Sequence, residues 1–211
     1  NQMYTIVLAS VSSSDSDFNG FNPEDVTVSN TDDETAGITV SSISGGTTET
    51  GGTATFTVKL NSQPTANVTI GVSSSDTTEG TVSPSSLTFT SSNYNANQTV
   101  TVTGVNDDLA DGNQSYTIVL AAANSSDNDY SGINPADVTV SNIDDETAGI
   151  TVSSISSSTT EVGGTATFMV KLNSEPTANV TIGVTSSDTG EGTVAPSSLT
   201  FTSSNYNANQ T

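Results

Sequence analysis

Residues 53–60 have the sequence Thr53-Ala54-Thr55-Phe56-Thr57-Val58-Lys59-Leu60, in which every second side chain from Ala54 onward is apolar. Successive side chains of a β-strand point to opposite faces, so this alternation predicts a strand with one face in a hydrophobic core. Similar patterns predict further strands within residues 38–43, 68–72, 81–89, 100–105, 116–120 and 138–143. No segment has the apolar period of an α-helix.

These strands and the turns between them predict an all-β fold, an immunoglobulin-like antiparallel β-sandwich. Residues 81–89 are expected to form one run that is interrupted at Pro84, because proline cannot donate to a sheet ladder. Gly104 is expected to form a β-bulge at the end of its strand.

The predicted strands belong to a tandem repeat with a period of 112 residues. Residues 1–99 and 113–211 align without a gap and are identical at 81 of 99 positions. This period exceeds the roughly 20–50 residues of a solenoid unit and suits one small domain per repeat. We therefore expect residues 1–34 to be the C-terminal strands of a preceding repeat, residues 35–146 a complete repeat, and residues 147–211 the N-terminal part of a following one.

The composition restricts the partners and the compartment of the protein. The chain has 23 Asp and Glu residues against two Lys, with no Arg and no His, and its formal net charge is −21. Nucleic acid and anionic membranes are excluded as partners, because binding to phosphates or to anionic lipids requires cationic side chains. Direct membrane insertion is not expected either. Cysteine is absent, so no disulfide supports the core. Strong acidity without cysteine suits a bacterial protein that is extracellular or on the cell surface.

The acidic residues gather at one end of the predicted sandwich. If the chain reverses direction at each connection, nine of the 12 acidic residues in 35–146 lie at the same end, and Asp127, Asp129 and Asp137 lie elsewhere. We call this end the acidic pole; its residues are Glu49, Asp76, Glu79, Asp107, Asp108, Asp111, Asp144, Asp145 and Glu146.

Such a concentration of carboxylates favours a bound cation. Neighbouring carboxylates repel one another, and no cationic side chain lies in these loops. Ca²⁺ takes six to eight oxygen ligands in loose geometry, whereas Zn²⁺ and copper favour the His and Cys ligands that this chain lacks. Mg²⁺ takes few protein ligands and many waters. The alternative, that these residues only solvate the loops, stays open at this point.

Several segments of the repeat resemble the Calx-beta domain. They are Thr48-Glu49-Thr50-Gly51-Gly52, residues 53–60, Leu87-Thr88-Phe89, Val105-Asn106-Asp107-Asp108 with Tyr116 to Leu120, and Asp144-Asp145-Glu146. Calx-beta domains are immunoglobulin-like sandwiches that bind several Ca²⁺ ions at their distal end, and in bacteria they often occur in surface or adhesion proteins. The resemblance implies that the Ca²⁺ ligands are Glu49, Asp76, Asp107, Asp108, Asp111, Asp144 and Asp145.

We add Glu146 to this ligand set, together with the counterparts of these residues in the other repeats: Asp32, Asp33, Glu161 and Asp188. The sequence departs from the family at Asn106 and Gln114, where acidic residues are common. Fewer charges imply fewer ions or weaker sites, with dissociation constants of roughly 10⁻⁴–10⁻³ M, as in extracellular modules.

The position of the acidic pole suggests a mechanical function. The chain passes from Asp144 and Asp145 almost directly to the next repeat at Gly149, so Ca²⁺ would stiffen the junction. We expect a calcium-binding structural repeat of an extracellular surface fibre or adhesin, a rod-like spacer whose partners are the neighbouring repeats. Tyr94 and Tyr206, at the opposite pole, are interpreted as packing or junction residues.

The sequence also suggests one alternative to the spacer. In the alternative reading, the chain is the subunit of a self-assembling filament, in which like subunits join head to tail by strand complementation. Enzymatic activity is not expected, because a chain without His, Cys or Arg lacks the usual pair of nucleophile and base.

Overall fold

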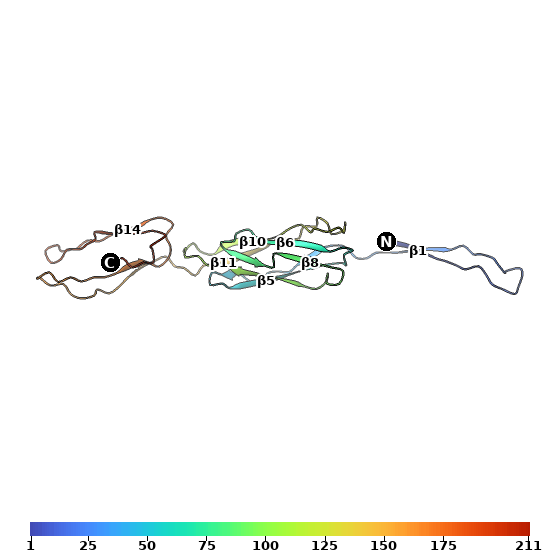
Figure 1. Cartoon of the computed structure of the whole chain (residues 1–211), viewed down its shortest axis with the longest axis horizontal. Helices are drawn as coiled ribbons and strands as arrows, with labels where there is room; N and C mark the ends of the chain where they lie inside the picture. Colours follow the sequence, from blue (N-terminus) through green and yellow to red (C-terminus); the bar gives the residue numbers. More distant parts are fainter.

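The computed structural model describes all residues, 1–211, and contains fifteen β-strands and no helix. The strands form three units in a line: an N-terminal hairpin, a central sandwich and a C-terminal group of strands (Figure 1). The prediction of an all-β fold is confirmed. None of its elements is a helix that could span a membrane.

The central unit is a sandwich of two sheets. Strand order is β3-β5-β9-β7 in the four-stranded sheet and β4-β11-β10-β6-β8 in the five-stranded sheet. All neighbouring strands are antiparallel except β4 and β11, which are parallel. The strands are β3 (Ile38–Val40), β4 (Thr47–Thr48), β5 (Thr53–Leu60), β6 (Val68–Ser74), β7 (Gly80–Ser83), β8 (Ser86–Phe89), β9 (Gln98–Gly104), β10 (Gln114–Leu120) and β11 (Val138–Ile143).

The core lies between these two sheets and follows the predicted alternation. In β5 the side chains of Ala54, Phe56, Val58 and Leu60 are all buried, while the residues between them are more exposed. Seventeen buried side chains form one cluster that draws on both sheets. Burial of this apolar surface is the main stabilising contribution, at roughly 25 cal/mol per Å² removed from water.

Three local predictions are wrong in detail. Residues 81–89 do not form one run in a single sheet, since β7 pairs with β9 in one sheet and β8 pairs with β6 in the other. The change of sheet falls at Pro84, which has no N–H for either ladder. Likewise, residues 38–43 form only the short strand β3, and the chain then crosses to the other sheet as β4.

Gly104 is also not a bulge, because it pairs directly with Gly80 as the last residue of β9. A Cβ atom at Gly104 would collide with the carbonyl oxygen of Thr48 and would lie 2.5 Å from Oδ1 of Asn142. Glycine is therefore required here, because the backbone of β4 and the side chain of Asn142 approach it closely.

The terminal units repeat the pairings of the central unit at the same offset. Strand β1 (Gln2–Ile6) pairs with β2 (Val26–Asn30) in the register of β10 with β11. In the C-terminal unit, β12 (Ile150–Val152) pairs with β13 (Val170–Leu172) as β3 does with β5. Strand β14 (Val180–Gly183) pairs with β15 (Ser198–Phe201) as β6 does with β8.

Equivalent residues differ in burial between the units. Tyr4 and Ile6 of the hairpin are 53% and 46% exposed, whereas their counterparts Tyr116 and Ile118 are 4% and 0% exposed. The hairpin segment forms the same strands but has no second sheet against it in this chain. Local pairing thus depends on the segment itself, and burial depends on the complete set of strands.

Candidate metal centre

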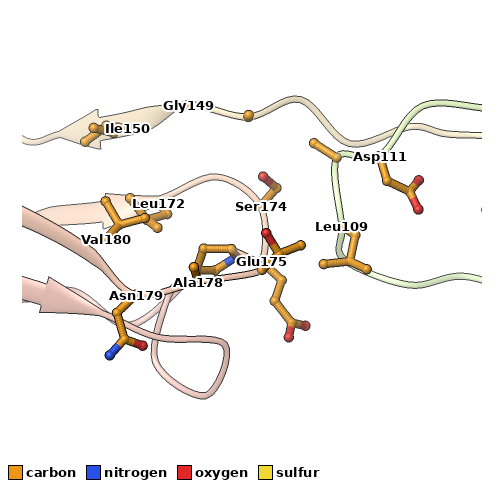
Figure 2. A pocket seen from close by; sticks show the side chains of 14 residues that line it. Leu109, Asp111, Gly149, Ile150, Leu172, Ser174, Glu175, Ala178, Asn179 and Val180 are labelled. Carbon is orange, nitrogen blue, oxygen red and sulfur yellow. The ribbon is translucent and has the colours of Figure 1, made fainter.

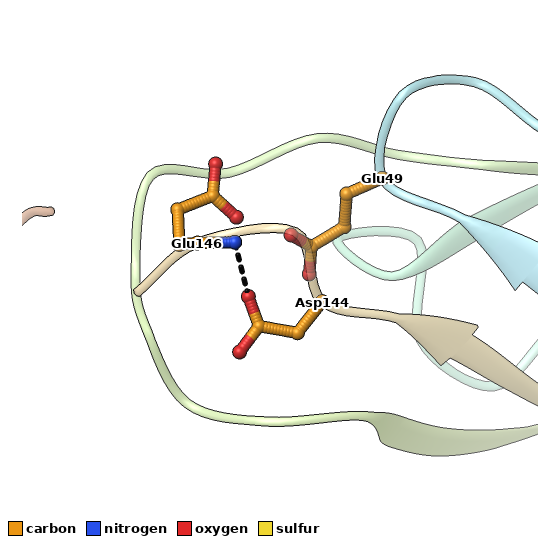
Figure 3. Close-up of side chains that lie close together, drawn as sticks. All are labelled: Glu49, Asp144 and Glu146. Carbon is orange, nitrogen blue, oxygen red and sulfur yellow. Dashed lines mark hydrogen bonds between the residues drawn. The ribbon is translucent and has the colours of Figure 1, made fainter. Parts of the chain in front are cut away.

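The first carboxylate cluster forms where β4 and β11 end side by side. Because these strands are parallel neighbours, with Thr48 opposite Ile143, the residues that follow them emerge at the same edge. Glu49 follows β4, and Asp144 and Glu146 follow β11 (Figure 3). One carboxylate oxygen from each of Glu49, Asp144 and Glu146 lies within 4.8 Å of the other two.

The second cluster forms at the adjoining edge of the four-stranded sheet and consists of Glu79, Asp107 and Asp111, whose carboxylate oxygens also lie within 4.8 Å of one another. Glu79 immediately precedes β7, and the loop with Asp107 and Asp111 follows β9. The antiparallel pairing of β7 with β9 continues past the strand ends, where the Val105 N–H donates to the Glu79 carbonyl at 3.0 Å. This contact fixes where the loop leaves the sheet.

Two hydrogen bonds connect the exit of β11 to the loop that carries Asp107 and Asp111, and one of them runs from the Asp144 N–H to Oδ1 of Asn113 at 3.1 Å. The Asp144 carboxylate accepts the Glu146 N–H at 2.8 Å through Oδ1 and the Gly112 N–H at 2.6 Å through Oδ2. Gln114 also steadies the loop, since its side-chain amide donates to the carbonyls of Asp111 and Gly112. Gln114 therefore supports the loop that carries Asp107 and Asp111.

Burial distinguishes the first cluster from acidic residues that only solvate a loop. Glu49 is 2% exposed, and its Oε2 atom is buried without a hydrogen-bond partner. Oε2 of Glu146 is buried and unpartnered as well. Buried polar atoms in folded proteins nearly always have a partner, because an unpaired one costs about 1–3 kcal/mol. Two such oxygens lie in one cluster, so this cluster could hold a cation.

Burial and mutual repulsion raise the pKa values of the two most buried acids of the acidic pole in the metal-free protein. Burial raises the pKa of Glu49 from 4.5 to about 8, and contact with Glu146 and the charge of Asp107 act in the same direction. Burial likewise raises the pKa of Glu79, against the hydrogen bond from Asn142 that favours its ionised form. Without a cation, the acidic pole therefore holds protons at pH values where exposed carboxyls have lost them.

The structure brings together some of the predicted ligands and leaves others apart. Five of the twelve lie in the clusters, namely Glu49, Asp107, Asp111, Asp144 and Glu146. Seven lie outside them, namely Asp32, Asp33, Asp76, Asp108, Asp145, Glu161 and Asp188. Glu79 is in a cluster but was not among the predicted ligands, although its place immediately before a strand of the acidic pole could have indicated it.

The residues outside the clusters have identifiable positions. The Asp76 carboxylate accepts the backbone N–H of Thr78 at 2.9 Å and its hydroxyl at 2.6 Å, which lowers the pKa of Asp76 and holds a turn. Asp145 is exposed. In the terminal units the counterparts Asp32, Asp33, Glu161 and Asp188 are exposed, because each unit carries only some of the segments that form the pole.

Asp108 contacts the following unit instead of the clusters. Its carbonyl accepts the Glu175 N–H at 2.6 Å, and Leu109 forms a parallel β-bridge with Glu175. The Asp108 carboxylate and burial raise the pKa of the Tyr206 hydroxyl to about 12. A cavity of about 590 Å³ lies between the units, with Leu109 on one side and Leu172 on the other (Figure 2). We call these contacts of Asp108 and Leu109 with Glu175 and Tyr206 the interunit contact.

Comparisons with known proteins identify no relative. No protein-family model matches the chain, and no curated protein matches its sequence. Among solved structures the chain is similar to WR4, a C. elegans member of the MSP family, with 15% identity over 47% of this chain and 89% of that chain. The TM-score is 0.31, which is too low to support a conclusion about fold or function.

In the absence of metal, we expect the free energy of unfolding to fall between about pH 5 and pH 8. A raised pKa means that folded Glu49 keeps a proton that the unfolded chain has released, so this stabilisation is complete below pH 4.5 and is lost by about pH 8. One such group contributes up to about 1.4 kcal/mol per pH unit. Urea unfolding in EDTA across this range measures the slope, and Glu49→Gln is expected to flatten it.

Glu24→Gln provides the matched control, because Glu24 is exposed and lies in the N-terminal hairpin. This control should reproduce the wild-type slope. An equal slope in wild type and in Glu49→Gln would show that Glu49 does not hold the proton.

Proposed function

We propose that the acidic pole of the central unit binds Ca²⁺ and that the protein is a Calx-beta-like, immunoglobulin-like spacer in an extracellular surface fibre or adhesin. The observation that carries this proposal is the buried, unpartnered Oε2 of Glu49 and of Glu146 within one cluster of three carboxylates. A cation placed among these oxygens supplies the missing partner for both atoms.

The donor chemistry favours Ca²⁺ over other cations. Two negative charges 4.8 Å apart repel by about 3 kcal/mol at an effective dielectric constant of 20, and each cluster holds three carboxylates. Every side chain in both clusters offers oxygen, and the chain contains neither His nor Cys. Ca²⁺ accepts such an all-oxygen set from flexible loops, whereas Mg²⁺ requires a tighter octahedron.

The location of the clusters links cation binding to the junction between units. Only residues 144–149 separate β11 from β12, and two ligands of the first cluster, Asp144 and Glu146, lie within this segment. A cation that holds them against Glu49 restricts the linker, and the interunit contact adds a second connection. The linear arrangement of the units in Figure 1 suits a rod-like spacer.

Calcium is expected to raise the melting temperature of the chain, and EDTA to lower it. A ligand that binds only the folded state stabilises it by about 2.7 kcal/mol at 100 times its dissociation constant. With a dissociation constant of roughly 10⁻⁴ M, 10 mM Ca²⁺ reaches that level. Thermal unfolding followed by circular dichroism measures the shift, which Glu49→Gln should reduce strongly and Glu24→Gln should leave intact. A melting temperature that does not respond to Ca²⁺ would refute the metal site.

Calcium is also expected to narrow the range of distances between successive units. Because the chain has no Cys, Thr88→Cys and Thr200→Cys can carry spin labels at equivalent exposed positions of two units. Pulsed electron–electron resonance should give a narrow distance distribution with Ca²⁺ and a broad one with EDTA. In EDTA, Tyr206→Phe should broaden the distance distribution further, because it removes the hydroxyl that lies at Asp108. The matched control Tyr94→Phe should leave the distribution unchanged. Equal widths with and without Ca²⁺ would exclude a stiffened junction.

A second candidate function, assembly of like subunits by strand complementation, is favoured by the exposed apolar faces of the terminal units. Val26 is 49% exposed in the hairpin and Ile150 is 54% exposed in the C-terminal unit. The hairpin has the sequence and register of the β10–β11 pair, so it is chemically suited to cover a unit that presents only the equivalents of β3 to β8. Burial of such faces favours association of one copy's hairpin with another copy's C-terminal unit.

Light scattering across a concentration series tests this association. We expect oligomers that Ile6→Asp disrupts, since Ile6 lies on the apolar face, while Thr5→Asp on the opposite face leaves them intact. A strictly monomeric wild-type chain at all concentrations would rule out strand exchange.

A further inference from the structure

The side chain of Asn142 lies beneath both carboxylate clusters. It is 0% exposed and is located in β11, two residues before Asp144. Its Nδ2 atom donates to the Val105 carbonyl at 3.0 Å and to Oε2 of Glu79 at 3.4 Å. Its Oδ1 atom accepts the Thr47 hydroxyl at 3.0 Å. One amide therefore contacts three other chain segments at once.

These segments are the ones that carry the clusters. Thr47 precedes Glu49 by two residues, Val105 precedes Asp107 by two, and Asn142 itself precedes Asp144 by two. The hydrogen bonds of Asn142 therefore join the segments that immediately precede these carboxylates. Glu79 belongs to the second cluster, and the Asn142 side chain donates a hydrogen bond to it directly.

The chemistry of this position requires an amide. Nδ2 faces a carbonyl and a carboxylate, which only accept hydrogen bonds, while Oδ1 faces a hydroxyl. An aspartate would place a third acceptor against those two, and an apolar residue would leave Glu79 and Thr47 without this partner in a buried site.

The network continues into the core. Since the Thr47 hydroxyl donates to Asn142, it accepts from the hydroxyl of Tyr116, which lies 3.1 Å away and is 4% exposed. Hydrogen bonds in such a chain strengthen one another in a buried environment. Gly104 permits the close approach, because a Cβ there would lie 2.5 Å from Oδ1 of Asn142.

We infer that Asn142 is a positioning residue that holds the two carboxylate clusters in one arrangement and so supports cation binding at both. The inference deepens the proposed function and rests on it for the cation. The buried, unpartnered oxygen of Glu49 marks the first cluster as a ligand site, and Asn142 joins the segments of that cluster to those of the second.

Two measurements on the full chain test this role. The first is hydrogen exchange of backbone amides without metal, at Glu49, Gly104 and Val105, whose N–H groups bond to Ile143, Gly52 and Glu79. Asn142→Ala should speed exchange at all three by about tenfold or more relative to amides in the centre of β5. The second is titration with Tb³⁺, a luminescent substitute for Ca²⁺. Asn142→Ala should weaken binding at both clusters by about tenfold or more, as loss of a residue that orients ligands typically does.

Two further variants keep the test decisive. Thr47→Val removes one hydroxyl with little change in shape and should give an intermediate effect at both clusters, even if Asn142→Ala fails to fold. Asn30→Ala alters the equivalent residue of the hairpin, which is exposed and has none of these partners, and should change neither measurement.

The outcomes separate the two proposals. Unchanged hydrogen-exchange rates in folded Asn142→Ala and in Thr47→Val would overturn the positioning role. Weaker Tb³⁺ binding at the cluster of Glu79 alone would overturn it as well. Absence of Tb³⁺ and Ca²⁺ binding by the wild type would overturn the proposed function, while the exchange measurement would still decide whether Asn142 holds the four segments together.

Discussion

The parallel pairing of β4 with β11 is the interaction on which the candidate site depends. The chain leaves the four-stranded sheet after β3 and joins the edge of the five-stranded sheet for two residues. Those two residues place the end of β4 beside the end of β11, and so place Glu49 beside Asp144. In an antiparallel pair the two strand ends would point to opposite poles, and these carboxylates would not meet.

A second constraint is that the chain cannot neutralise this pole by itself. It has two lysines for 23 acidic residues, and both lysines lie on strands, Lys59 in β5 and Lys171 in β13. The carboxylates must therefore hold protons, remain exposed to water or bind a cation from solution. The exposed acids, such as Asp145, remain in contact with water. Glu49 and Glu79 are the most buried acids of the pole, and Oε2 of Glu49 has no hydrogen-bond partner, whereas Glu79 accepts a hydrogen bond from Asn142. Because burial raises the pKa of both acids, the fold of the pole is sensitive to pH.

The repeats within one chain act as an internal comparison. Tyr4 and Tyr116 have the same neighbours in sequence and the same strand pairing, yet only Tyr116 is buried, because only the central unit has both sheets. The acids differ in the same way. Asp32 and Asp144 follow equivalent strands, but only Asp144 has a neighbouring carboxylate from another segment, that of Glu49. Each segment of the repeat thus forms its strands from its own sequence. The carboxylate clusters form only where the remaining segments of the repeat pack around it.

The sequence by itself determined most of the strands, their alternation and the end of the sandwich at which the acids gather. These depend on a period of two and on reversal at each turn, which are local properties of the chain. Only the tertiary structure decided which acids meet. The sheet change at Pro84 separates β7 from β8 and sets Glu79 against Asp107 and Asp111, while Asp108 faces Glu175 of the next unit. Asn142 is one polar residue among many in the sequence, and its place beneath both clusters follows from contacts with residues 37 to 95 positions away. Such contacts depend on register and on sheet packing, which no local period specifies.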